Sequence, residues 1–332
     1  MAGLCTAARA RELGLEPVVF EKGTRAGGSM LLSSCVVWRH RTLDGFRKEC
    51  PGGDPALQQL IVERLDGAIA WLVSLGAPVV QQETENPRTT GKRFDAKGLT
   101  EALVQAAGDV RLGSPFEPMD APLVLATGGF PVRLARERGL LVRSNPWSTG
   151  DGLEYAQALG AASSGDLDEF YGRTMPAPPA RIREEDFVRL SQLWGGQPRL
   201  VNEAGEEFFA GPPAWHESDL AQALARQPGG TGWFVLPPER RTDPRVVAAR
   251  DAGGTVLEGE GELRLHVAAS VTHTLGGIHA DTEARVLGGD GAPLAGLYAA
   301  GVDAGGIASG GYASGLAQAL VLGLAAAESL AL

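Results

Sequence analysis

The stretch that decides the fold is residues 272–323, THTLGGIHADTEARVLGGDGAPLAGLYAAGVDAGGIASGGYASGLAQALVLG. It opens with a glycine-rich loop at 272–277, and a buried-type strand follows at 296–300. A second glycine-rich loop at 305–311 leads into an apolar helix that begins near Ser314. Glycine lets the backbone approach a ligand closely, and a helix start presents unpaired N–H groups and partial positive charge. This order of elements predicts a site that binds a phosphate group or a flat ring.

The composition is that of an ordinary globular protein. The chain has 332 residues, of which 44% are hydrophobic and 21% charged, enough for one large or two modest domains. The net charge of −10 argues against nucleic acid and against an anionic membrane surface as partners. No apolar run reaches the roughly 18 residues that span a bilayer, and no signal peptide is visible. The three cysteines show no metal-binding spacing, so we expect reduced thiols, no metal site and a cytoplasmic protein.

The N-terminal residues, MAGLCTAARARELGLEPVVFEK, predict a helix at 2–13, a strand at 17–20 and then an acid, Glu21. In a dinucleotide-binding βαβ unit, such a helix follows a strand and a glycine-rich turn, and an acid about 20 residues later holds the ribose. Gly3 and Glu21 fit the last glycine and the acid, whereas the first strand and the first two glycines have no counterpart. We therefore expect a reading frame that starts at an internal methionine; the alternative is a self-sufficient variant.

Several motifs carry a family resemblance. THTLGGI, GLYAAGVDAGG and GYASGLAQALVLG resemble the C-terminal flavin-binding motif of the fumarate reductase/succinate dehydrogenase flavoproteins and the 3-ketosteroid dehydrogenases. VVFEKGTRAGGS (18–29) and LVLATGGF (123–130) agree, and the motifs occur in the family's order. The resemblance implies an α/β fold: a Rossmann-like FAD-binding domain of the glutathione-reductase type, lacking its first strand, with an inserted α+β cap domain. Its segments would be the FAD-binding parts 1–130 and 263–332 and the cap 131–262.

FAD is the cofactor that the resemblance implies, bound without a covalent link. Backbone groups from both ends of the chain would hold it. The implied FAD-binding residues are Gly3, Glu21, Lys22, Gly27, Gly28, Ser29, Ala126, Thr127, Gly128, Gly301, Asp303, Gly315 and Leu316. Cys35 stands where the family often has glycine, and we interpret the nearby His40 as a surface histidine.

Other segments are expected to support this site. Apolar periodicity predicts scaffold helices at 55–75 and 94–107, and only residues 109–121 stand where relatives have a long β-meander. In the cap we expect a helix at 150–159, a proline-rich loop at 173–179, a hairpin at 199–209 (RLVNEAGEEFF), helices near 218–226 and 243–252, and a strand at 232–236.

The catalytic candidates also come from the resemblance. Flavin oxidoreductases of this family move a hydride between the flavin and a carbon, while another group handles a proton next to a carbonyl. His273 matches a histidine that binds the substrate carboxylate in fumarate reductases; the alternative is a histidine that caps the loop. The two arginines of those enzymes are replaced, one by Glu207 or its neighbour Glu206 and the other by Tyr312, which argues against a dicarboxylate substrate.

Tyr312 and Ser314 instead resemble the GYxSG segment of 3-ketosteroid Δ4-(5α)-dehydrogenases, in which the tyrosine and serine lie at the substrate carbonyl and the proton-transfer position. A phenol with a pKa of about 10 can donate a hydrogen bond or a proton. Alternatively, Tyr312 packs and Ser314 only caps the helix. Tyr155 and Tyr171 are the candidates for a cap-domain partner.

Together these features predict an FAD-dependent oxidoreductase that acts on a CH–CH bond next to a carbonyl. The substrate would be a ketosteroid- or enoate-like small molecule, and the catalytic residues would be Tyr312, Ser314 and His273. The electron partner is not identified. The alternative function is a non-catalytic remnant of a flavoprotein fold, which a colourless purified protein would favour.

Overall fold

The computed structural model describes residues 1–115, 121–195 and 199–332. These residues form two compact units. The first contains Met1–Phe130, Asn145–Glu169 and His273–Leu332, and the second contains Pro131–Ser144 and Phe170–Thr272. Compared with the division drawn from the sequence, residues 145–169 lie in the first unit, and the second unit extends to Thr272.

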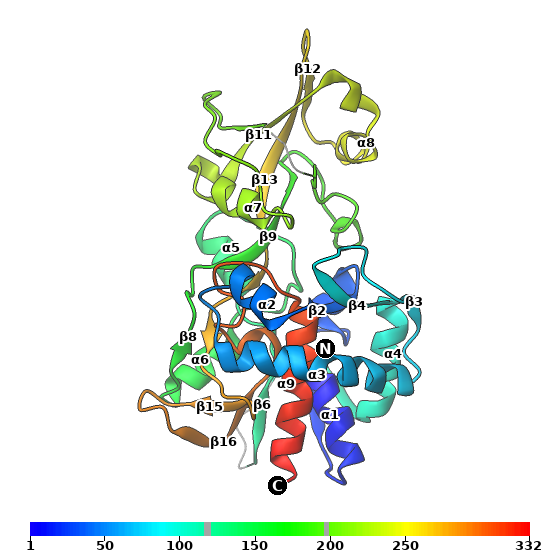
Figure 1. The fold of residues 1–332 in the computed structure, drawn as a ribbon, viewed down its shortest axis with the longest axis vertical. Coiled ribbons are helices and arrows are strands. Elements are labelled where there is room, and N and C mark those ends of the chain that lie inside the picture. The colour runs from blue at the N-terminus through cyan, green and yellow to red at the C-terminus, as the bar shows by residue number, and fades with distance from the viewer. Residues whose placement is uncertain (116–120, 196–198) are drawn as a thin grey trace. The chain divides into compact units, whose positions relative to one another are not determined.

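Four helices form the centre of the first unit: α1 (Ala2–Glu12), α3 (Pro55–Ser74), α4 (Ala96–Ala107) and α9 (Gly315–Leu330). Helix α9 packs against α1 and α3, and α1 also packs against α4 (Figure 1). The close approach of α1 and α9 depends on small residues, because a Cβ added to Gly323 would lie 2.9 Å from the carbonyl oxygen of Ala2. Each fully buried leucine in these helices stabilises the fold by about 1.5–3 kcal/mol.

Among its described residues, the first unit has two separate pairs of parallel strands. Strand β1 (Val18–Glu21) pairs with β5 (Asp109–Leu112), and β6 (Leu123–Leu125) pairs with β16 (Pro293–Ala299). Strand β15 (Arg285–Leu287) joins the other edge of β16 in antiparallel orientation. Within the described residues, no ladder joins one parallel pair to the other.

Smaller elements surround these strands. An antiparallel sheet contains β2 (Val36–His40), β4 (Thr89–Phe94) and β3 (Val79–Gln81), in that order, and β14 (Gly277–Ile278) pairs with β8 (Ser163–Ser164). The remaining helices of this unit are α2 (Leu43–Glu49), α6 (Asp151–Ala158) and the short 3-10 helices η1 (Gly28–Leu32) and η5 (Gly301–Asp303).

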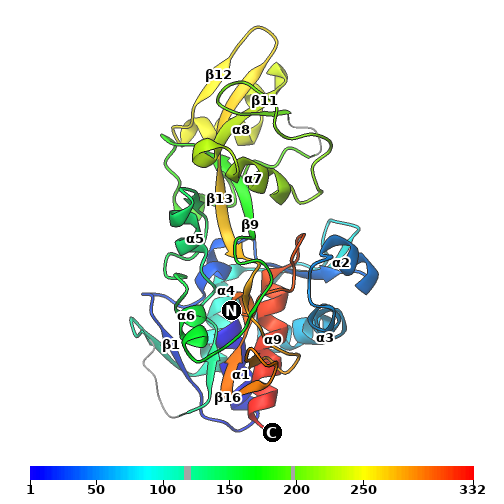
Figure 2. The same ribbon diagram turned by 90° about the vertical axis from the view of Figure 1, so that its left-hand side faces the viewer.

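The second unit is built on one sheet around the long strand β13 (Leu263–Thr274), whose last two residues belong to the first unit (Figure 2). Its other strands are β7 (Leu141–Val142), β9 (Phe170–Pro176), β10 (Arg199–Val201), β11 (Thr231–Leu236) and β12 (Val256–Glu258), and its helices are α5 (Pro131–Glu137), α7 (Ser218–Ala225) and α8 (Pro244–Asp251), with 3-10 helices at Glu184–Asp186, Pro228–Gly230 and Pro238–Thr242. The expected loop at 173–179 is wrong in its first half, because β9 continues through Pro176.

Local sequence signals explain why the predicted scaffold helices form. The carboxylate of Asp54 accepts hydrogen bonds from the N–H groups of Ala56 and Leu57 at the start of α3, and Pro55 occupies the first turn. Gly76, with a φ of +85°, follows the end of α3. The predicted helices at 2–13, 55–75 and 94–107 are therefore confirmed within one or two residues.

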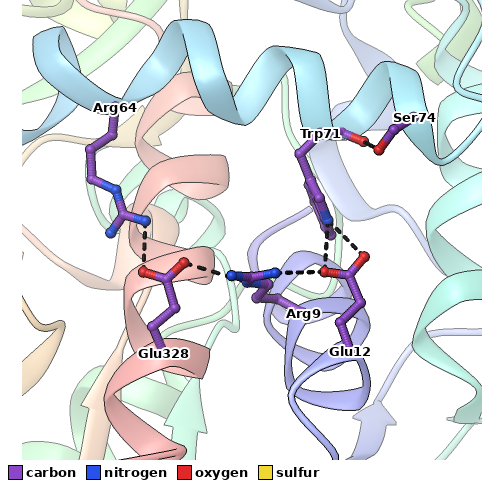
Figure 3. Close-up of polar contacts among 6 residues, drawn as sticks. All are labelled: Arg9, Glu12, Arg64, Trp71, Ser74 and Glu328. Atoms are coloured by element: carbon purple, nitrogen blue, oxygen red, sulfur yellow. Dashed lines mark hydrogen bonds and ion pairs between the residues drawn. The ribbon is translucent and has the colours of Figure 1, made fainter.

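A polar cluster ties the far end of α9 to α1 and α3 (Figure 3). Glu328 accepts from Arg64 Nη2 at 2.6 Å and pairs with Arg9 Nε at 3.4 Å. Arg9 also pairs with Glu12, whose carboxylate accepts from the indole N–H of Trp71 at 2.9 Å. Since these groups are about one-third exposed, each ion pair stabilises by no more than about 1 kcal/mol, and the cluster mainly fixes how the three helices align.

Candidate functional site

The start of α9 has the geometry of a helix N-terminus that can receive a ligand. Ser314 caps it: the Oγ atom accepts from the N–H of Ala317 at 3.2 Å and donates to the carbonyl oxygen of Val36 at 3.5 Å. The capping role foreseen as an alternative for Ser314 is thus present. The helix start carries partial positive charge of roughly +0.5, which favours a negatively charged or electron-rich group in front of it.

His273 lies against this helix start. A Cβ added to Gly315 would be 3.4 Å from Cε1 of the His273 ring. His273 reaches this place because it is near the end of β13, where the strand enters the first unit. The arrangement brings together two of the sequence-predicted residues, His273 and Gly315, in front of the first turn of α9.

Tyr312 lies just before α9 and contacts the sheet β2–β4–β3. Its ring centroid is 5.2 Å from that of Trp38, and its carbonyl oxygen is 3.2 Å from Nε2 of His40. The interpretation of His40 as a surface histidine is wrong, because only 3% of the residue is exposed. His40 ends β2, and the residues of this strand at 38 and 40 point to the same side by the two-residue period.

Asp303 joins two of the predicted FAD-binding loops. Its Oδ1 accepts from the hydroxyl of Thr127 at 2.8 Å, and its Oδ2 accepts from the N–H of Gly128 at 2.9 Å. Asp303 is 1% exposed, and this burial raises the pKa of its carboxyl group. The carboxylate therefore holds the loop after β6 against η5.

Glycines bring the two ends of the chain together. A Cβ on Gly3 would be 3.3 Å from Cβ of Ala126, and a Cβ on Gly301 would be 3.0 Å from Cβ of Ala2. Gly301 also has a φ of +72°, a conformation that favours glycine. The start of α1 thus lies against the ends of β6 and β16, so Gly3, Ala126 and Gly301 meet in one place.

The loop 27–29 adopts a backbone that needs glycine. Gly27 has a φ of +103° and Gly28 a φ of +53°. The Oγ of Ser29 accepts from the N–H of Asn145 at 3.0 Å, and a Cβ on Gly28 would find its nearest atom 3.7 Å away, on the Asn145 amide. Sequence reasoning missed Asn145, because an asparagine in an irregular segment carries no pattern of its own.

Of the remaining predicted cofactor residues, Glu21 and Lys22 have hydrogen-bond partners within the chain. Oε1 of Glu21 accepts from the N–H of Gly23 at 2.7 Å, and Nζ of Lys22 bonds Thr149 at 2.8 Å and Asp151 at 2.5 Å. Leu316 is half-buried in the first turn of α9. The structure therefore ties Lys22 to the start of α6.

These residues fit a flavin nucleotide. Within the described part of the chain, Oδ1 of Asn145 and Oγ1 of Thr274 are buried with no hydrogen-bond partner, a costly condition that a polar ligand would relieve. Asn145 lies beside the loop 27–29, and Thr274 lies beside Gly129, whose added Cβ would be 2.6 Å from Oγ1 of Thr274. No group of three or more potential metal ligands occurs among the described residues, and no helix described there could cross a membrane.

Glycine-rich loops at the ends of parallel strands, followed by a helix start, are typical of α/β proteins that bind a nucleotide cofactor. Comparison with protein families places the chain in one such family: residues 95–316, more than half of the chain, match the model of the FAD binding domain. The protein belongs to this family of FAD-dependent oxidoreductases, which confirms the expected cofactor, FAD. The motif at 18–29 lies outside the matched range.

Individual proteins share a stretch of sequence or the fold with this chain. A KsdD-like steroid dehydrogenase of Mycobacterium tuberculosis is 42% identical over 79 residues, which are 24% of this chain and 12% of the relative. A flavocytochrome c3 fumarate reductase in an open conformation matches with a TM-score of 0.76 and 20% identity, covering 99% of this chain and 76% of the other. The 3-ketosteroid-Δ4-(5α)-dehydrogenase of Rhodococcus jostii RHA1 matches with a TM-score of 0.70 and 17% identity, covering 99% and 94%. The two structures show that the fold is shared.

Proposed function

We propose that this protein is an FAD-dependent oxidoreductase that acts on a CH–CH bond next to a carbonyl, in a ketosteroid- or enoate-like substrate. The observation that carries the proposal is the placement of His273 and Tyr312 at the start of α9, in a chain that belongs to the FAD binding domain family. Bound FAD would exchange a hydride with one substrate carbon. The chain's own residues then have to bind the carbonyl and handle the proton on the neighbouring carbon.

Tyr312 and His273 are assigned to the carbonyl. When the neighbouring carbon loses its proton, negative charge develops on the carbonyl oxygen, and a phenol O–H or an imidazole N–H can donate to it. The helix start at Gly315 adds a favourable partial charge at the same place. The absence of arginine at 206, 207 and 312 supports an uncharged carbonyl rather than a dicarboxylate.

Ser314 is assigned to the proton. Its hydroxyl donates only a long hydrogen bond, 3.5 Å to the carbonyl oxygen of Val36, so exchanging this partner for a substrate atom costs little. The Ser314 oxygen stays oriented because it still accepts the capping hydrogen bond from the N–H of Ala317. One residue thus combines capping with a proton-transfer position.

The finer fold assignment is part of this proposal. The pairs β5–β1 and β6–β16 would be two halves of one Rossmann-like sheet, and the second unit would be the cap. Glu21 at the end of β1 and Gly3 in α1 have the spacing of an acid and the last glycine of a dinucleotide-binding unit. The substrate would be a small molecule with a carbonyl, and the setting would be the cytoplasm.

The test is to purify the protein with added FAD, measure its flavin content, and follow flavin reduction anaerobically with a panel of 3-ketosteroids and, in the reverse direction, enoates. We expect a yellow protein whose flavin is reduced by at least one ketosteroid. Tyr312→Phe should lower turnover without loss of flavin, and Tyr298→Phe in β16 is the matched control. A protein that binds FAD but reacts with no member of the panel would contradict the proposed reaction and favour the non-catalytic alternative.

A further inference from the structure

The histidine that sequence reasoning placed at the surface makes a specific contact with the residue assigned to the substrate carbonyl. Nε2 of His40 is 3.2 Å from the carbonyl oxygen of Tyr312. A carbonyl oxygen only accepts hydrogen bonds, so Nε2 has to carry the hydrogen and donate it. This contact fixes the tautomer of the imidazole, because in the neutral ring the other nitrogen is then unprotonated.

Aromatic rings enclose the imidazole. Its centroid is 5.3 Å from that of Trp38, edge to face, and 4.9 Å from that of Phe46 in α2. Trp38 in turn contacts the ring of Tyr312 at 5.2 Å. The main chain and the side chain of Tyr312 are therefore both held by β2, the first through His40 and the second through Trp38.

The surroundings keep His40 neutral near neutral pH. Burial lowers the pKa of His40, and the hydrogen bond to Tyr312 and the charge of Glu49 oppose this only in part. Cys50 is another ionisable group close to the same main-chain segment, and burial raises the pKa of its thiol to about 12, so it is neutral as well. Of these groups, only Glu49 brings a charge near the imidazole.

The rest of the glycine-rich loop is anchored on either side of Tyr312. The N–H of Gly310 donates to Oε1 of Glu169 at 2.7 Å, and a Cβ on Gly311 would lie 1.8 Å from the carbonyl oxygen of Glu49, so this glycine packs tightly against α2. Ser314 caps α9 two residues after Tyr312. Between these anchors, the His40 hydrogen bond acts on the peptide of Tyr312 itself.

We propose that His40 is a positioning residue for Tyr312: its Nε2–H holds the Tyr312 carbonyl and thereby sets where the phenol lies. The inference rests on the proposed function, in which the phenol binds the substrate carbonyl. Without the donor, the part-buried carbonyl oxygen of Tyr312 loses the hydrogen bond from His40, so the peptide after Tyr312 is held less firmly. Because a misplacement of about 1 Å can cost about 100-fold in rate, turnover falls more than substrate binding does.

The experiment compares His40→Gln, whose amide N–H reaches the same place, with His40→Leu, which has no donor. His279→Leu, at a half-buried histidine of the same unit, is the control. With the FAD-loaded enzyme we expect His40→Leu to lower kcat about 10- to 100-fold with little change in KM. His40→Gln should restore most of kcat, and the control should match the wild type.

Two further measurements separate this inference from the proposed function. The double variant His40→Leu/Tyr312→Phe should be no slower than Tyr312→Phe alone, because both changes act through one phenol. Hydrogen exchange of the segment 305–314, which needs no substrate, should be faster in His40→Leu than in His40→Gln. If the exchange responds but no substrate turns over, the positioning contact stands and the proposed reaction fails.

The inference is overturned if His40→Leu leaves the exchange of 305–314 unchanged, or if the losses of His40→Leu and Tyr312→Phe multiply in an active enzyme. Should His40→Leu not fold, His40→Asn replaces it, since the shorter amide does not reach the Tyr312 carbonyl. If His40→Asn had the same hydrogen exchange and the same kcat as His40→Gln, the inference would also be overturned.

Discussion

The carboxylate of Asp303 accepts a hydrogen bond of 2.8 Å from the hydroxyl of Thr127, a residue 176 positions earlier in the chain. The same carboxylate accepts a hydrogen bond from the N–H of Gly128 at 2.9 Å. Asp303 itself is buried, with 1% of its surface exposed. The two donors are part-buried, so the loss of this acceptor costs less than the roughly 1–3 kcal/mol of each fully buried donor. Asp303 therefore fastens the loop after β6 to η5, the short helix that follows β16.

Asp303→Ala should lower the free energy of unfolding by about 1–3 kcal/mol, because the Thr127 hydroxyl and the Gly128 N–H, both part-buried, lose their acceptor. Urea unfolding followed by circular dichroism measures this change. Asp290→Ala is the control. Asp290 is exposed, and the N–H of Ala292, which donates a hydrogen bond to it, can bond to water instead. Equal, small losses in the two variants would show that the Asp303 contacts do not support the fold.

Asp303 should also give the protein a characteristic pH dependence. Its pKa is raised by burial, so the folded protein keeps a proton that the unfolded chain has lost above about pH 3.9. The free energy of unfolding should then fall as the pH rises from about 3.9 to the raised pKa, by at most about 1.4 kcal/mol per pH unit. The difference between wild type and Asp303→Ala, measured across this range, isolates the effect. A difference that is independent of pH would contradict it.

The close packing of Gly301 predicts a graded cost of substitution. Gly301→Ala places a Cβ 3.0 Å from Cβ of Ala2 and forces alanine to a φ of +72°. Gly76→Ala has only the unfavourable backbone conformation, because the φ of Gly76 is +85° and nothing lies within 4 Å of an added Cβ. We expect Gly76→Ala to cost about 1 kcal/mol in unfolding free energy and Gly301→Ala about 1–3 kcal/mol more. Thermal unfolding of both variants tests this prediction. Equal losses of stability in the two variants would mean that α1 moves to accommodate the new Cβ at no energy cost.

The cysteines should be unreactive in the folded protein. Burial raises the pKa of Cys5, Cys35 and Cys50 to about 12 in each case, so almost no thiolate is present near neutral pH. A thiol reagent added to the native protein should label none of them within the time in which it labels all three after unfolding. Rapid labelling of any one under native conditions, located by mass spectrometry, would show that its segment opens readily.

The sequence predicted the elements whose signals are local. Apolar periodicity located α3 and α4 to within two residues, and the glycine-rich loop before Ser314 located the start of α9. The hairpin around 199–209 is also confirmed, since Val201 bridges to Glu207. These features depend on residues close together in the chain, so one sequence is sufficient to find them.

Features that depend on distant contacts were missed. His40 is buried only because β2, α2 and the loop around Tyr312 meet there, and Asn145 is near Ser29 only in the folded chain. Cys35, which stands where the family often has glycine, keeps the left-handed conformation with a φ of +53°, at a strain of about 1–2 kcal/mol. The first half of the expected loop at 173–179 pairs as β9 with β13, a ladder that its prolines do not reveal.

The central claim is that backbone from both ends of the chain contacts one FAD, and hydrogen exchange during a titration with FAD tests it most directly. We predict that FAD slows exchange in three segments, 27–30, 126–130 and 301–316, and that all three respond with the same half-saturation concentration. Protection confined to one of these segments, or no protection at any concentration of FAD, would contradict the claim.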